Sequence, residues 1–302
     1  MSSPFSALFV LLIILFQAGN GQQIRLIETS EVVLLFEGPL RSAAKELTDI
    51  YPGVKKELEE IFRWKLNFRP TILLLNNKDS FHRIAGSDLI VAVAIPQRNI
   101  IVIDYPKMRT RPFAIRTTLK HELSHLLLHH YIKRTNLPKW LDEGISQWVS
   151  EGIAEIIIDG KRSFLNEAIL SNRYLTLDEL TARFPEDTNS LLLAYEQSKS
   201  FVDYISNTFG RNAILNILNH LRDGYGVDEA VLKGLSIPLD ELEQTWHSHL
   251  RTSNTWITYI STNLYQFLFF ITALITIYGF IRFVIKKRGY TDEDEETFLS
   301  FD

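Results

Sequence analysis

The chain has 302 residues, of which 46 % are hydrophobic and 23 % are charged, and these proportions are typical of a globular protein. Its formal net charge of −4 argues against a nucleic-acid-binding protein, because recognition of phosphates requires a positive surface. The chain contains no cysteine, so an exported domain would have to be stable without disulfide bonds. Its length accommodates one domain, or two small ones, beside any targeting or membrane segments.

An apolar segment lies near the N-terminus. Residues 5–16 are almost entirely apolar and are followed by small and polar residues, and this length is typical of the central region of a signal peptide. Residues 1–21 are therefore predicted to be a signal peptide. The basic start of a typical signal peptide is missing, which leaves an uncleaved N-terminal anchor as the alternative.

A longer apolar segment, residues 264–285, is predicted to be a transmembrane helix. Residues 264–281 contain no charged side chain, and a helix of this length crosses the hydrocarbon core of a bilayer. The basic run at residues 286–288 follows directly, and by the positive-inside rule it lies in the cytoplasm. The sequence thus predicts a single-pass protein of the cell membrane, with residues 286–302 as a cytoplasmic tail and everything before the helix outside.

Between these segments, the first part of the chain is predicted to mix strands with one long helix, and we assign residues 22–110 to an upper α/β lobe. Apolar runs bounded by turn residues predict the strands, and a stripe at helical spacing predicts the helix, whose weak point is Pro52-Gly53. The strands are expected at residues 23–26, 32–36, 71–75, 89–95 and 99–104, the last two as a hairpin about residues 96–98. The helix is expected at residues 39–64, with Leu40, Ala43, Leu47, Ile50, Val54, Leu58 and Ile61 on its stripe.

After residue 104 the pattern becomes helical, and we assign residues 111–252 to a helical lobe. Pro112 is expected in the first turn of a helix over residues 111–133, and Pro138 is expected to open the next helix, which runs to about residue 151. The exterior domain is therefore predicted to be of the α+β class, with its site between a small sheet and the helices. Further helices are expected at residues 191–207, 212–222, 227–232 and 239–252.

The central motif is His121-Glu122-Leu123-Ser124-His125, which lies inside the predicted helix 111–133. Residues four apart share one face of a helix at a separation of about 6 Å, so both imidazoles can reach one Zn²⁺ at about 2.0–2.1 Å. Glu122 flanks the ion without binding it, and it is placed to take a proton from water on the metal. So short a motif also arises by chance, but on its own it already favours a metal site over histidines that only pack on a helix face. A catalytic zinc site also needs a third protein ligand.

His129 continues the histidine stripe but is excluded as the third ligand. Eight residues of helix rise about 12 Å, so His121 and His129 cannot bind one ion unless the helix breaks. His129 and His130 are therefore interpreted as packing or rim residues.

Glu143, within the segment at residues 140–144, is the better candidate for the third ligand. Two helices joined by a short turn can bring Glu143 back over His121 and His125. Two histidines and one glutamate, with water in the fourth position, are a standard ligand set for hydrolytic zinc. The sequence therefore predicts one zinc ion per chain, held by His121, His125 and Glu143, with Glu122 as the catalytic base.

The motifs HELSH (residues 121–125) and WLDEG (residues 140–144) together resemble the gluzincin metallopeptidases, in particular the small peptidase-MA-like group. The segments at residues 194–204 and 238–250 are also similar to that group, and the resemblance covers roughly residues 70–250. It implies a thermolysin-like fold with an upper α/β lobe, an edge strand over the metal and a lower helical lobe.

The resemblance also implies a reaction, in which Glu122 takes a proton from water and returns it to the leaving amine of a peptide. Tyr195 is a candidate donor to the oxyanion, by analogy with the helical-lobe Tyr or His of many gluzincins; aromatic packing is the alternative reading. Thermolysin-like enzymes place an Asp one turn after the Glu ligand, but this chain has Gln147 there, which leaves Asp142 as an alternative partner for a ligand histidine. The substrate strand is expected within residues 89–104, in either arm of the hairpin.

The sequence therefore predicts a membrane-anchored, extracytoplasmic zinc metallopeptidase that acts on peptides or proteins and binds no nucleic acid. The alternative is an inactive zinc-binding ectodomain that binds a partner. Retention of Glu122 favours the enzyme, since a purely structural zinc site needs no base beside the metal. Four other histidines belong to no shared motif and are interpreted as surface or core residues: His82, His220, His247 and His249.

Overall fold

The structure is a computed structural model and describes residues 24–87, 89–108, 114–151, 163–262 and 264–298. The expected signal peptide, residues 1–21, lies outside the described residues, and so does Pro112. The chain divides into two compact units, residues 1–246 and residues 247–302. The first unit holds a small sheet and a larger body of helices, so the predicted α+β class is confirmed.

A five-stranded mixed sheet, of order β1-β2-β3-β5-β4, lies in the first unit. Strands β2, β3 and β5 are mutually parallel, whereas β1 and β4 run antiparallel to their neighbours and form the two edges. The predicted hairpin is confirmed, and β4 is its outer arm. The strands are β1 (Ile24–Glu28), β2 (Val33–Glu37), β3 (Thr71–Leu75), β4 (Ala92–Ile95) and β5 (Ile100–Asp104).

Helices cover both faces of this sheet. On one face, Phe81 of α3 (Lys78–Ala85) joins a core cluster with alternate residues of β2, β3 and β5. The intervening strand residues are equally buried, and they face α2 (Arg41–Phe62) and α5 (Ile115–Tyr131), which pack against each other. Because both faces are covered, the central strands are continuously apolar rather than alternating in polarity. Helix α3 was not predicted from the sequence.

Helix α2 continues through Pro52 without interruption, although the sequence marked this residue as a weak point. The predicted stripe is also partly wrong, because Tyr51 and Phe62 are buried whereas Ile50 and Ile61 are only half-buried. A proline inside a helix costs about 3 kcal/mol. Burial of one large apolar side chain stabilises the fold by about 1.5–3 kcal/mol. The buried side chains of α2 together therefore outweigh the cost of the proline.

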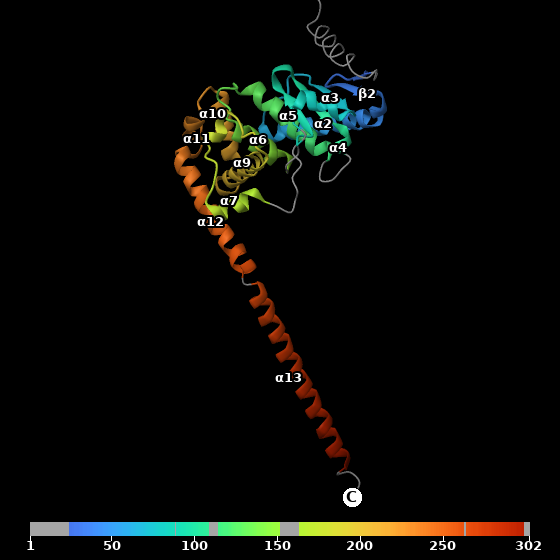
Figure 1. Cartoon of the computed structure of the whole chain (residues 1–302), viewed down its shortest axis with the longest axis vertical. Helices are drawn as coiled ribbons and strands as arrows, with labels where there is room; N and C mark the ends of the chain where they lie inside the picture. Colours follow the sequence, from blue (N-terminus) through green and yellow to red (C-terminus); the bar gives the residue numbers. More distant parts are fainter. Residues whose placement is uncertain (1–23, 88, 109–113, 152–162, 263, 299–302) are drawn as a thin grey trace, which may run out of the picture. The chain divides into compact units, whose positions relative to one another are not determined.

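The rest of the first unit is helical, and the helices predicted after residue 138 are all present. Figure 1 shows α5 between the sheet side of the unit, with α2 and α3, and the helical side, with α6, α9, α10 and α11. Helix α5 begins at Ile115 rather than at residue 111, and α12 is longer than expected. The remaining helices are α4 (Tyr105–Met108), α6 (Lys139–Ser150), α7 (Phe164–Ser171), α8 (Glu179–Ala182), α9 (Thr188–Phe209), α10 (Arg211–Arg222), α11 (Val227–Leu235) and α12 (Leu239–Thr262).

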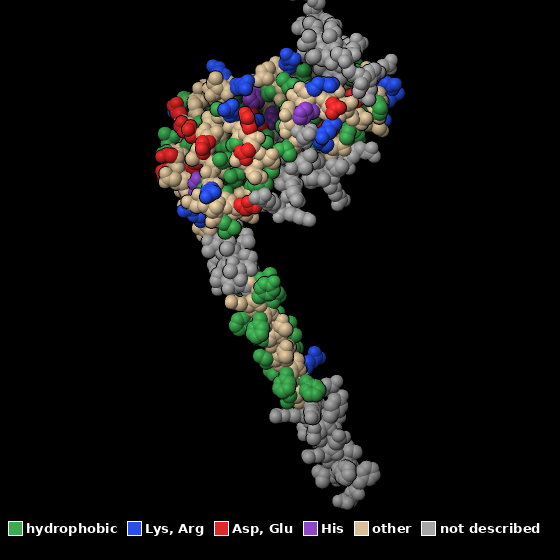
Figure 2. Space-filling model, in the orientation of Figure 1, with side chains coloured by type: hydrophobic (Ala, Val, Ile, Leu, Met, Phe, Trp, Pro, Cys, Tyr) green, Lys and Arg blue, Asp and Glu red, His purple; other side chains and the backbone are tan. Residues whose placement is uncertain are grey.

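The second unit contains helix α13 (Leu264–Phe298). Its segment Leu264–Ile285 has 22 residues, none of them buried, and Figure 2 shows hydrophobic side chains along it. Within the described part of the chain, this is the one helix long and apolar enough to cross a bilayer. Length and composition alone support this reading, so α13 is a candidate membrane span.

Candidate metal centre

Helix α5 carries the H-E-x-x-H motif in its buried interior. It contacts α2, α6, β4 and β5, so side chains are buried around its whole circumference. A helix that is buried on all sides needs apolar side chains around its whole circumference. In α5, leucines occupy the positions between the polar residues. His121, Glu122 and His125 are consequently held in a rigid, nearly solvent-free setting.

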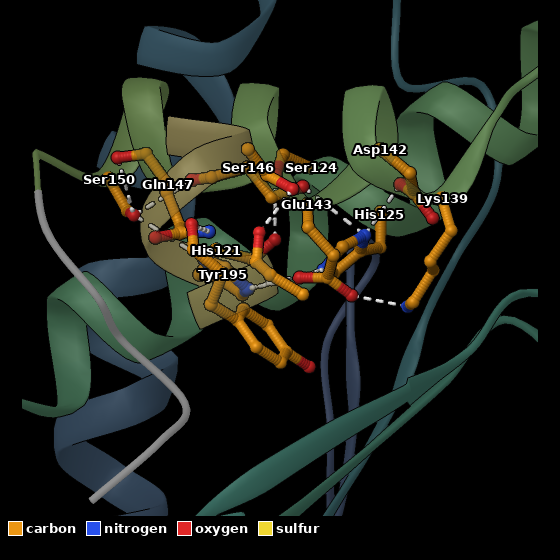
Figure 3. A network of polar contacts seen from close by, with 12 residues as sticks. His121, Ser124, His125, Lys139, Asp142, Glu143, Ser146, Gln147, Ser150 and Tyr195 are labelled. Carbon is orange, nitrogen blue, oxygen red and sulfur yellow. Dashed lines mark hydrogen bonds and ion pairs between the residues drawn. The ribbon is translucent and has the colours of Figure 1, made fainter. Parts of the chain in front are cut away.

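Helix α6 brings Glu143 against α5. The chain leaves α5 at Ile132, passes through the buried Leu137 and Pro138, and enters α6 at Lys139. Glu143 is 2 % exposed and faces the two imidazoles of α5 (Figure 3).

Three ligand atoms converge between α5 and α6. The Nε2 atoms of His121 and His125 are 3.2 Å apart, and Glu143 Oε2 lies 3.6 and 3.5 Å from them respectively. In a tetrahedral zinc site with bonds of about 2.0–2.1 Å, any two ligand atoms are about 3.3–3.4 Å apart. The three atoms therefore have the spacing of three corners of such a site, as predicted from the sequence.

The chemistry of this donor set also fits a metal ion. Glu143 Oε2 is buried and receives no hydrogen bond from the described residues, while it points at two ring nitrogens. Lone pairs at this separation repel one another unless a proton or a metal ion lies between them. Two imidazoles and one carboxylate are typical zinc ligands, so the cluster is compatible with a zinc site.

Asp142 positions one of the two imidazoles. Its Oδ1 lies 2.7 Å from His125 Nδ1, and its Oδ2 lies 2.9 Å from His129 Nε2. The contact to Nδ1 turns the Nε2 atom of His125 towards the cluster. Of the two partners left open by the sequence, Asp142 is thus the one in contact with a ligand histidine, whereas Gln147 Nε2 donates to the carbonyl oxygen of Tyr195 at 3.2 Å.

The charges of these groups are strongly coupled. Burial by itself would lower the pKa of His125, but the carboxylates of Asp142 and Glu143 outweigh burial and raise that pKa well above its usual value. Burial favours the neutral form of the Asp142 and Glu143 carboxyl groups. Lys139 and His125 nevertheless hold the pKa of Glu143 well below its usual value, and His125 holds the pKa of Asp142 well below its usual value. The centre therefore favours an additional positive charge, which a proton or a metal ion can supply.

A cavity of about 700 Å³ opens onto the centre. Glu122, His125 and Glu143 lie at its floor, and three residues of β4 form one of its walls. Tyr195 of α9 lines another wall, with its ring edge-on to Phe184 at 5.0 Å between centroids. The structure thus brings the predicted base, Glu122, and the predicted donor, Tyr195, to the same cavity as two of the three predicted ligands, His125 and Glu143. His129 also lines this cavity, and it contacts Asp142 rather than the converging ligand atoms.

Lys139 and Ser146 are among the residues of the centre that were not identified from the sequence. Lys139 Nζ forms an ion pair with Glu143 Oε1 (Figure 3), and Ser146 Oγ lies 3.2 Å from His125 Nδ1. The spacing of four residues between Lys139 and Glu143 is a signal that could have revealed the ion pair. No comparable signal marks Ser146.

A family model described as Peptidase MA superfamily matches residues 85–252, which is more than half of the chain. The chain belongs to the Peptidase MA superfamily. The matched region of this Peptidase MA protein runs from β4 to α12 and includes the whole metal centre. The membership confirms the resemblance seen in the HELSH and WLDEG motifs, and it makes the chain a metallopeptidase-like protein.

One similar solved structure is a mutant M1 zinc metallopeptidase from Deinococcus radiodurans bound to a Tyr-Ser-Ala substrate. It matches this Peptidase MA chain with 15 % sequence identity and a TM-score of 0.37, over 76 % of this chain and 51 % of that chain. The chain therefore spans about half the length of that protein. No curated protein matches the chain.

Proposed function

We propose that this protein is a membrane-anchored, extracytoplasmic zinc metallopeptidase that hydrolyses peptide bonds. The observation that carries the proposal is the convergence of His121 Nε2, His125 Nε2 and Glu143 Oε2 beneath a cavity, in a member of the Peptidase MA superfamily. A zinc ion bound by these residues would supply Lewis acidity, which polarises a peptide carbonyl and lowers the pKa of water.

Glu122 is the proposed general base. It is buried, it lines the same cavity as His125 and Glu143, and it is not one of the three converging ligands. From this position its carboxylate takes the proton of the attacking water and returns it to the leaving amine. Tyr195 is proposed to donate a hydrogen bond to the carbonyl oxygen as negative charge develops on it, because its side chain lines the cavity from α9.

Strand β4 is the proposed binding edge for the substrate backbone. It is an edge strand of the sheet, and Ala92, Val93 and Ala94 line the cavity. An extended peptide can therefore add to the sheet through main-chain hydrogen bonds while it lies over the metal centre. This assigns the role to the outer arm of the hairpin. It supports a thermolysin-like arrangement, with residues 22–110 as the upper lobe and residues 111–252 as the helical lobe.

Zinc binding tests the ligand assignment directly. The full chain in detergent is expected to bind one zinc ion, and His125→Ala is expected to lose it. Asp142→Asn should keep the ion but bind it about 10–100-fold more weakly, because the residue orients His125. Metal content and competition with a chelator measure both effects.

The histidines further along α5 provide matched controls for this series. His129→Ala should retain one zinc per chain, with a smaller loss of affinity than Asp142→Asn, since His129 contacts only the far oxygen of that carboxylate. The His130 ring contacts the tilted ring of Phe68 instead, so His130→Ala should leave zinc affinity unchanged. Wild-type zinc affinity in His125→Ala would remove that residue from the ligand set.

The proposed topology places residues 22–263 outside the cell and residues 286–302 in the cytoplasm, with the segment Leu264–Ile285 of α13 as the anchor. The chain has no cysteine, so single cysteines can report on each side. Ser300→Cys is expected to resist a membrane-impermeant thiol reagent in intact cells and to react after lysis. Ser42→Cys, on the exposed side of α2, should react in intact cells. Labelling of the tail cysteine in intact cells would reverse the orientation.

A further inference from the structure

Two arginines line the cavity on its helical side. Arg134 lies in the turn between α5 and α6, and Arg183 directly follows α8. Both side chains are exposed, and both line the same 700 Å³ cavity as the metal centre. They therefore contribute positive charge to the space that the proposed function gives to the substrate.

Neither arginine is neutralised by a strong ion pair. Arg183 lies 4.0 Å from Glu186, but 84 % and 92 % of these two side chains are exposed, and such a pair contributes little in water. Arg134 forms no hydrogen bond or ion pair with the part of the chain that the structure describes. Both guanidinium groups can accordingly bind a further anion.

The acidic residues of the cavity have other partners. Among the described residues that line the cavity, the acidic ones are Glu122, Asp142 and Glu143, and all three are buried at its floor. Asp142 contacts His125 and His129, and Glu143 contacts Lys139 and points at both ligand imidazoles. The described lining has as many basic side chains, Arg134, Lys139 and Arg183, as acidic ones, so these charges cancel. A bound divalent cation would therefore give the cavity a net positive charge.

We infer that Arg134 and Arg183 are specificity-determining residues that select peptides carrying a carboxylate close to the scissile bond. The inference rests on the proposed function, since it takes the ligand of the cavity to be a peptide. A peptide backbone is neutral, so it leaves the excess positive charge unmatched. A guanidinium group binds a carboxylate through two parallel hydrogen bonds, which makes arginine a specific receptor for this group. The carboxylate can belong to an acidic side chain or to the C-terminus of the peptide.

Peptide binding to the full-length Glu122→Gln variant, loaded with zinc in detergent, tests this inference. The probes are acetylated peptides labelled with a neutral dye and identical except at one position, which holds Glu, Gln or Lys, each with an amidated C-terminus. A fourth peptide has Gln and a free C-terminal carboxylate. Fluorescence anisotropy should show about tenfold tighter binding of the Glu peptide, of the free-carboxylate peptide, or of both, than of the amidated Gln peptide. Which of the two binds more tightly identifies the source of the carboxylate.

The arginine variants show where the preference arises. The double variant Arg134→Gln/Arg183→Gln should bind all four peptides with similar affinity, and added salt should weaken the preference in the parent protein. Arg25→Gln removes one positive charge from β1, at the opposite edge of the sheet from β4, and should keep the preference. Equal binding of the four peptides by the parent protein, or a preference that survives in the double variant, would overturn the inference.

Binding is measured without turnover, so the outcome is separate from that of the proposed function. Cleavage of peptides without regard to charge, together with equal binding, would refute the carboxylate preference and leave the peptidase intact. A carboxylate preference in a protein that hydrolyses no peptide would support the roles of the arginines and refute the peptidase.

Discussion

Glu122→Gln is expected to bind zinc as tightly as the wild-type chain and to lose peptide hydrolysis by about 10²–10⁴-fold. Glutamine preserves the size of the side chain but cannot take a proton at neutral pH. The proposed ligand atoms belong to His121, His125 and Glu143, so the metal should remain bound. Zinc content and kcat, measured on the same preparation of the full chain, separate the two properties.

The matched control for this variant is Glu46→Gln. Glu46 is exposed on α2, outside the cavity, and its replacement should change neither zinc content nor turnover. Undiminished hydrolysis by Glu122→Gln would remove Glu122 as the base. A wild-type chain that binds zinc but cleaves no member of a peptide library would instead favour the alternative function, an inactive ectodomain that binds a partner.

The metal centre was predictable because much of it depends on the geometry of one helix. The spacing of His121 and His125 places both imidazoles on one face of α5, and the rise of the helix excludes His129. Glu143 required one further assumption, that the turn at residues 136–138 folds the next helix back onto the helix with the two histidines. The structure confirms this assumption, since α5 and α6 pack together.

The partner of His125 could not be decided in the same way. Asp142 and Gln147 lie on either side of Glu143 in the sequence, and successive residues of a helix point in different directions. Which of them reaches α5 depends on how α6 is rotated and shifted relative to α5, and no local pattern encodes this offset. In the structure, α6 directs Asp142 towards His125 and His129, and it directs Gln147 towards Tyr195 on α9.

The parts of the fold that were missed are short elements and details of packing. Helix α3 has eight residues and few apolar side chains, so its periodicity is weak. Its ends nevertheless carry local signals, because Asn77 caps the N-terminus through Ser80 N and Gly86 ends the helix at a φ of 70°. The stripe of α2 shifted to Tyr51 and Phe62 because tertiary contacts, rather than the sum of apolar residues, determine which side of a helix is buried.

Gly144→Ala is expected to disrupt the metal centre from the side opposite to the ligands. A Cβ atom at this position would lie 2.4 Å from the carbonyl oxygen of Ser198 and 2.7 Å from Cγ2 of Val202, both on α9. The backbone oxygen cannot rotate away, so α6 and α9 have to separate, and such overpacking costs about 1–3 kcal/mol or more. Since Glu143 precedes Gly144 on α6, the same displacement moves a proposed zinc ligand. The melting temperature of the metal-free chain and the affinity of the chain for zinc should therefore both fall.

Gly53→Ala makes the same chemical change where there is room for it. In α2 the added Cβ would lie 3.7 Å from Arg116 Nη1, which is an ordinary contact and the nearest one among the described residues outside its own stretch of helix. Alanine also has a higher helix propensity than glycine by about 1 kcal/mol, so this variant should be as stable as the wild type or more stable. If Gly144→Ala matched Gly53→Ala in both stability and zinc affinity, the close approach of α6 to α9 would not be what holds Glu143 over the two histidines. If stability and zinc affinity fell in Gly144→Ala alone, helix packing would require the glycine that follows Glu143 in the WLDEG motif. Without a side chain there, α6 can approach α9 closely enough to hold Glu143, the proposed third ligand, in place.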